Sequence, residues 1–131
     1  MCCLYGLIDT KRSLSEARKM KLLHALATAA EVRGTDASGI AYRTEGRLMI
    51  RKAAIPGHRL KMSVPGDTIT IMGHARMTTQ GNEKFNRNNH PFRGKTPAGA
   101  FALAHNGVLW NQDKRMNGIL RHNKNIGVFF K

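Results

Sequence analysis

The second residue of the chain is a cysteine that could act as a nucleophile from the N-terminus. The sequence opens MCCLYGLID, and Cys2 and Cys3 are its only two cysteines. Removal of Met1 would leave Cys2 with a thiol and a free α-amine, whose pKa of about 8 lies well below that of a lysine. This amine could then serve as the general base for its own thiol. The alternative is that both cysteines are small apolar residues at the start of a strand.

Two further segments place polar groups where a substrate could be held. Residues 73–82, GHARMTTQGN, continue a β-branched run, and Arg76 at the end of a strand could bind a carboxylate through its bidentate fork. Asn106 and Gly107 interrupt the apolar run of residues 99–110, and could direct one amide side chain and one backbone N–H at a single point as an oxyanion hole. The alternatives are a solvated arginine and a type I′ turn, for which Asn-Gly is the strongest signal.

Two other polar motifs have structural interpretations. Residues 33–39, RGTDASG, predict the end of a helix followed by a tight turn. His90 lies in NNHPF, and the chain lacks the CxxC and HExxH zinc patterns. Because His74 and His105 lie on separate segments, we interpret His90 as a residue that holds the loop, and we predict no metal and no cofactor.

Together these motifs resemble the glutaminase domain of class II glutamine amidotransferases, which are N-terminal nucleophile hydrolases. They are Met-Cys at the start, then RGTDASG, GHARMTTQGN, NNHPF and HNG, and they cover about residues 1–112 of one domain predicted over residues 1–131. The resemblance implies an αββα sandwich that hydrolyses glutamine to glutamate and ammonia through a thioester. It also implies an ammonia-accepting protein or domain as a partner.

The resemblance assigns a role to each candidate site residue. Cys2 would be the nucleophile, with its own α-amine as the base. The side chain of Asn106 and the backbone N–H of Gly107 would stabilise the oxyanion. Arg76 would hold the α-carboxylate of glutamine, and the surroundings of Thr79 would line the same pocket.

The sequence also departs from the family pattern. Cys3 replaces the usual glycine, Met77 replaces an aromatic residue, and Gln80 replaces a histidine. The family continues to a threonine-aspartate stretch that binds the α-amine of glutamine, whereas the last aspartate here is Asp113 and the tail, residues 113–131, diverges. We therefore expect a truncated domain with an open apolar sheet face and little or no glutaminase activity. The alternative is a non-catalytic, degenerate amidotransferase that acts as a binding partner.

Charge and composition restrict the other classes of function. The 131 residues carry 22 Lys and Arg against 8 Asp and Glu, a net charge of +14, which suggests a polyanionic partner. The cations are spread along the chain and aromatic residues are only 6%, so a nucleic-acid-binding protein is the less favoured alternative. Adjacent cysteines, no signal-peptide pattern and no apolar run of about 18 residues predict a reduced, cytoplasmic protein outside the membrane.

Hydrophobic patterning and turn residues predict an α+β fold that positions these groups. Strands are expected at residues 3–8 and 68–76, a hairpin at 38–53 with its turn at 44–46, and a further strand at 99–110. A helix is expected over residues 13–32. Its predicted N-cap is Ser13, with Glu16 completing a capping box. Its predicted apolar face comprises Leu14, Ala17, Met20, Leu23, Leu26 and Ala30.

Overall fold

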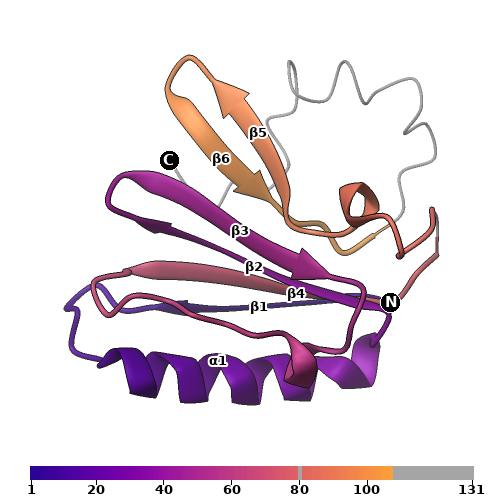
Figure 1. The fold of residues 1–131 in the computed structure, drawn as a ribbon, viewed down its shortest axis with the longest axis horizontal. Coiled ribbons are helices and arrows are strands. Elements are labelled where there is room, and N and C mark those ends of the chain that lie inside the picture. Colours follow the sequence, from indigo (N-terminus) through magenta and orange to yellow (C-terminus); the bar gives the residue numbers. More distant parts are fainter. Residues whose placement is uncertain (80, 108–131) are drawn as a thin grey trace.

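A computed structural model of the chain describes residues 1–79 and 81–107, which form three layers (Figure 1). One helix, α1 (Glu16–Ala30), covers one face of a four-stranded antiparallel sheet. A separate hairpin lies over the other face. The predicted α+β class agrees with this arrangement. Gln80, the last part of the strand predicted at 99–110, and the tail at 113–131 lie outside the described residues.

The sheet is built from strands that the sequence predicted. They are β1 (Cys3–Ile8), β2 (Ala37–Thr44), β3 (Arg47–Ala53) and β4 (Thr70–Arg76), in the order β1-β4-β2-β3. Cys3 pairs with Ala75, and Ala37 pairs with Arg76. The start of β1, the start of β2 and the end of β4 therefore meet at one end of the sheet.

Local turn chemistry determines the hairpin of β2 and β3. Glu45 and Gly46 both have positive φ, 48° and 72°, as a type I′ turn requires. The turn predicted at residues 44–46 is confirmed.

The second hairpin contains a strand that the sequence did not predict. It pairs β5 (Phe92–Thr96) with β6 (Gly99–Leu103). The sequence of β5, FRGKT, is short, charged and largely exposed, so it lacks the alternation that marks a strand. Within the hairpin, Gly94 lies opposite Phe101, and a Cβ at this position would lie 2.1 Å from the ring.

The predicted start of α1 was wrong. Ser15, and not Ser13, is the N-cap, and its Oγ accepts a hydrogen bond from the backbone N–H of Arg18 at 3.3 Å. Ser13 instead donates to Asp9 Oδ1 through its backbone N–H at 2.9 Å and its hydroxyl at 3.2 Å. Ser13 is therefore bound to the Asp9 carboxylate and does not form the predicted capping box.

Two apolar cores lie on opposite faces of the sheet. The core beneath α1 comprises Leu23, Ala27, Ile40, Tyr42, Met62, Val64 and Ile71. The core beneath the second hairpin comprises Ala41, Leu48, Met72, Ala102 and Ala104. The predicted helix face was only partly right, because Ala17 is exposed and the buried residues of α1 are Lys19, Leu23, Ala27 and Ala30.

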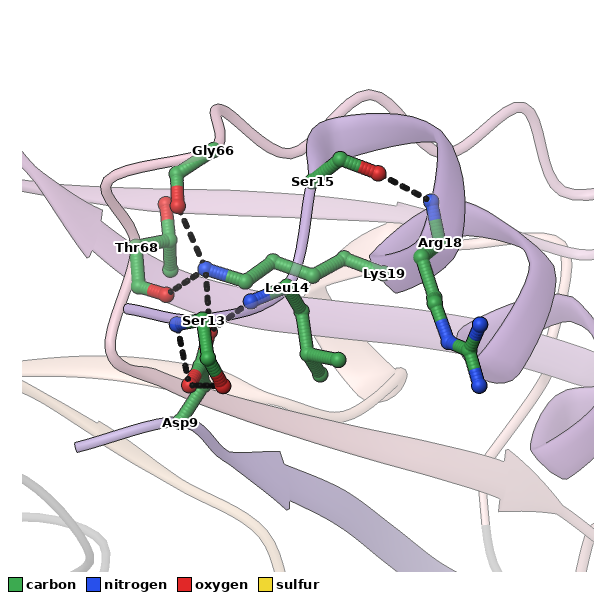
Figure 2. A network of polar contacts seen from close by, with 8 residues as sticks. All are labelled: Asp9, Ser13, Leu14, Ser15, Arg18, Lys19, Gly66 and Thr68. Atoms are coloured by element: carbon green, nitrogen blue, oxygen red, sulfur yellow. Dashed lines mark hydrogen bonds and ion pairs between the residues drawn. The ribbon is translucent and has the colours of Figure 1, made fainter. Parts of the chain in front are cut away.

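A buried ion pair joins α1 to the sheet (Figure 2). Lys19 is fully buried, and its Nζ lies 3.2 Å from Asp9 Oδ2. The same ammonium donates to the carbonyl oxygens of Gly66 at 2.5 Å and Thr68 at 2.6 Å. The backbone N–H of Leu14, then Ser13 and Lys19, lower the pKa of Asp9 to about 2. One contact set thus connects the end of β1, the start of α1 and the loop before β4.

One face of β1 is exposed to solvent in the described part of the chain. Leu4 is 39% exposed and Ile8 is 66% exposed, whereas Tyr5 and Leu7 pack against the core beneath α1. The open apolar sheet face expected from the sequence stays a prediction, because among the described residues the second hairpin packs against the central strands. No helix among the described residues is long and apolar enough to cross a bilayer.

Replacing Lys19 with methionine should destabilise the fold strongly. The variant keeps a long side chain but leaves the Asp9 carboxylate buried without its cation, and breaking a buried pair is costly. We expect the midpoint of thermal unfolding, followed by circular dichroism, to fall by about 10 °C or more. The double variant Asp9→Asn/Lys19→Met should recover part of this loss. The exposed Lys21→Met is the matched control, and an equal midpoint for Lys19→Met and Lys21→Met would contradict the role of the pair.

Candidate functional site

Cys2 lies at the end of the sheet where β4 finishes. It precedes β1 directly and is half-buried, and its thiol donates to the carbonyl oxygen of Met77 at 3.6 Å. The Met1 ammonium contacts Sδ of the same Met77 at 2.8 Å. With Met1 attached, the nitrogen of Cys2 is an amide and cannot act as a base. Loss of Met1 would expose an amine beside the thiol and next to the end of β4.

The RGTDASG segment holds the chain in place as it leaves β4. The backbone N–H of Asp36 donates to the carbonyl oxygen of Arg76 at 3.0 Å, and Asp36 Oδ2 accepts from the backbone N–H of Thr78 at 2.6 Å. A Cβ on Gly34 would lie 2.4 Å from the backbone of both Arg76 and Met77, so no side chain fits. The motif predicted as a helix end and turn therefore also positions the residues after β4.

Arg76 is buried at the end of β4 and lies against an asparagine. Arg76 is only 6% exposed, and its Nη1 donates to Asn89 Oδ1 at 2.6 Å. Asn89 is fully buried, and its Nδ2 donates to the carbonyl oxygen of Glu83 at 2.7 Å. Its own carbonyl oxygen accepts from Lys52 Nζ at 2.6 Å. The guanidinium is therefore fixed in orientation and is not the solvated arginine that the sequence left open.

Asn89 is a positioning residue that sequence reasoning missed. It belongs to the NNHPF motif, in which His90 was the evident candidate because a histidine can carry a proton or bind a metal. Two adjacent asparagines before a histidine were the available signal. Nothing local indicated that the second would be buried under Arg76.

The remaining candidate residues lie on exposed segments. Thr79 is exposed, close after the Thr78 backbone N–H held by Asp36. Asn106 and Gly107 are exposed and follow β6. Neither is among the described residues with positive φ, so the pair does not form the type I′ turn that Asn-Gly often signals.

Histidines connect the Asn106 segment to β4. His74 Nε2 lies 3.3 Å from the carbonyl oxygen of His105 and 2.9 Å from His90 Nδ1. A carbonyl can only accept, so we assign the proton to His74 Nε2, which leaves His90 Nδ1 as an acceptor. Because His74 pairs with Leu4 in β1, these contacts bring the segment before Asn106 to the strand that follows Cys2.

The two histidines are held neutral by burial. Burial lowers the pKa of His74 to about 4, and burial together with the neighbouring His74 lowers the pKa of His90 to about 3. The ring of His90 also packs edge-on against Phe92, with centroids 4.3 Å apart. These contacts agree with the interpretation of His90 as a residue that holds the loop. In residues 1–79 and 81–107, no three His, Cys, Asp or Glu side chains gather as metal ligands would.

The chain is similar to enzymes described as glutamine–fructose-6-phosphate aminotransferase (isomerizing). The protein from Chlamydia trachomatis is 34% identical over 116 residues, which is 87% of this chain and 18% of that protein. The protein from Caldanaerobacter subterraneus is 36% identical over 115 residues, 85% of this chain and 17% of that protein. The protein from Mycobacterium tuberculosis is 38% identical over 87 residues, which is 62% of this chain and 14% of that protein. The chain thus spans less than a fifth of the length of these curated relatives. No family model matches the chain.

The histidine pair should make stability depend on pH between about 7 and 5. Both folded-state pKa values lie below the ordinary 6.5, so the unfolded chain binds more protons in this range. Stability is complete above about pH 6.5 and falls as the pH decreases, by up to about 1.4 kcal/mol per pH unit for each histidine. Urea unfolding at pH 7, 6 and 5 would measure this slope.

A pair of variants separates the buried histidines from the exposed ones. His90→Asn should reduce the slope by about half, because one of the two buried titrating groups is lost. His24→Asn on the exposed face of α1 should leave the slope unchanged. A free energy of unfolding that does not vary over this pH range would contradict the burial of both rings as neutral groups.

Proposed function

We propose that the chain, which belongs to the class II glutamine amidotransferase family, hydrolyses the side-chain amide of glutamine to glutamate and ammonia through Cys2, at the low rate expected from its sequence. The observation that carries the proposal is the position of the half-buried Cys2 thiol, 3.6 Å from the carbonyl oxygen of the residue that follows Arg76. The nucleophile and the cation for the substrate carboxylate then share one end of the sheet.

The reaction begins with removal of Met1. The freed α-amine of Cys2 takes the thiol proton, and the thiolate attacks the amide carbon of glutamine. The tetrahedral oxyanion is stabilised by the side chain of Asn106 and the backbone N–H of Gly107. Collapse of this intermediate breaks the C–N bond, the amine returns the proton to the leaving ammonia, and a thioester forms. Water then cleaves the thioester to release glutamate.

Buried contacts support the proposed substrate pocket. Arg76 holds the α-carboxylate of glutamine, and Asn89 keeps the guanidinium in one orientation through its 2.6 Å hydrogen bond. Asp36 holds the Thr78 backbone, and so orders the segment that carries Thr79 along the pocket. We propose that the ammonia passes to an acceptor on another domain or protein, because the similar enzymes are aminotransferases.

The layers also support the fold that the resemblance implies. Helix α1, the four-stranded sheet and the β5-β6 hairpin are stacked in the order expected for the first three layers of an αββα sandwich (Figure 1). The exposed Leu4 and Ile8 of β1 lie where a larger second sheet would extend over this face. We therefore propose that the described residues adopt the N-terminal nucleophile hydrolase arrangement.

The proposed reaction requires an unblocked Cys2. Purified chain should show the mass of a protein beginning at Cys2, and only this form should release ammonia from glutamine in a coupled assay. Cys2→Ala should have no activity, whereas Cys3→Ala, the adjacent matched control, should retain it. Turnover by protein that still carries Met1, or by Cys2→Ala, would contradict the mechanism.

Asn106 and Arg76 should affect different kinetic constants. Asn106→Ala removes one oxyanion donor and should lower kcat by about 10²–10³-fold. Arg76→Lys keeps the charge but loses the bidentate fork, and should mainly raise KM because it binds a carboxylate that does not react. Steady-state ammonia release against glutamine concentration would separate the two. An unchanged kcat for Asn106→Ala would remove it from the oxyanion site.

A further inference from the structure

A groove lies on the surface formed by β3, the segment that follows it, and the start of β5. Its volume is about 740 Å³, within the range of roughly 300–1,000 Å³ typical of small-molecule sites. None of the candidate site residues of the glutaminase reaction lines it. It is therefore a concave surface of the described part of the molecule that the proposed glutaminase reaction does not use.

The groove is lined by cations and by no described carboxylate. The cationic lining residues are Arg51, Lys52, Arg59, Lys61 and Arg93. Three of them, Arg51, Arg59 and Lys61, are exposed, and their side chains form no hydrogen bond or ion pair with the described residues. Surface cations are commonly dispersed or paired with carboxylates. Here several cations without a partner among the described residues line one concave surface.

The other two cations fix the walls of the groove. Lys52 Nζ donates to the carbonyl oxygens of Asn89 at 2.6 Å and Pro91 at 3.0 Å. Arg93 Nη2 donates to the carbonyl oxygen of Leu48 at 2.5 Å. These bonds tie β3 to β5 across the two hairpins, so the groove does not depend on a single flexible loop.

Apolar side chains complete the groove between the cations. Ile50, Ile55, Leu60 and Pro91 contribute to its lining. None of the described aromatic residues lines it, so the described lining offers no platform on which successive bases of a nucleic acid would stack. The lining instead suits a compact ligand that has several negative charges and a small apolar portion.

We propose that this groove binds small anions that carry a chain of phosphate groups, with or without an organic part. Arg51 and Arg59 offer the planar fork that matches phosphate oxygens, and Lys61 adds a point charge. The absence of described carboxylates from the lining means that no fixed negative charge repels such a ligand. The site is separate from the proposed glutaminase site, so it does not depend on that activity.

Binding can be tested by calorimetric titration of the full chain with two probes, tripolyphosphate and ATP, without added metal and at about physiological ionic strength. The groove variant is Arg51→Ser/Arg59→Ser. The matched control is Arg47→Ser/Lys95→Ser, which removes two exposed cations from β3 and β5 outside the groove and lowers the net charge equally. Circular dichroism would verify that both variants remain folded.

We expect both probes to bind, and the groove variant to raise the Kd about tenfold or more while the control changes it less than about threefold. Tighter binding of ATP than of tripolyphosphate would show that the apolar lining contacts the organic part, and equal binding would show that phosphate groups alone are recognised. Absence of binding at millimolar probe, or equal weakening in both variants, would overturn the proposal. Tighter binding of poly-glutamate or single-stranded RNA that depends on Arg51 and Arg59 would also overturn it.

Discussion

The ion pair between Lys19 and Asp9 is the constraint on which the arrangement of β1 depends. A buried ammonium and a buried carboxylate are tolerated only when their hydrogen-bonding capacity is satisfied, and the carbonyl oxygens of Gly66 and Thr68 and the Ser13 and Leu14 N–H groups provide this. Asp9 directly follows β1 and Cys2 directly precedes it. Anchoring one end of the strand to the helix therefore determines where the other end, with the candidate nucleophile, lies against β4.

A second set of contacts acts at the opposite end of the sheet. Asp36 and Gly34 hold the backbone after β4, and Asn89 holds the guanidinium of Arg76. These residues come from three separate parts of the sequence, and each is fixed by a backbone or buried side-chain contact. An arginine held in this way loses little further freedom when it binds a carboxylate, and such preorganisation would favour the role proposed for Arg76.

The positive charges are dispersed along the sequence but partly clustered in the folded protein. Along the sequence the cations are dispersed, and this dispersion argued against a basic binding arm. Hydrogen bonds between β3 and the start of β5 bring Arg51 of β3, Arg59 of the following segment and Arg93 of β5 onto one groove. Dispersed cations can therefore form a local anion-binding surface, because strands far apart in sequence become neighbours.

The sequence by itself determined the elements whose signals are local, and the tertiary structure decided those that depend on distant partners. The turn at residues 44–46 and the strands of the main sheet follow from residue conformational preferences and short-range patterning, and the order of the motifs identified the family. The helix start was mispredicted because Asp9, which Lys19 holds in a buried ion pair, accepts the hydrogen bonds of Ser13. Strand β5 lacks an apolar alternation and is recognised only by its pairing with β6, and Arg76 is oriented by its hydrogen bond to the buried Asn89. The contacts of Lys19 with Gly66 and Thr68, and of Arg76 with Asn89, join residues that no local pattern connects, so only the folded chain reveals them.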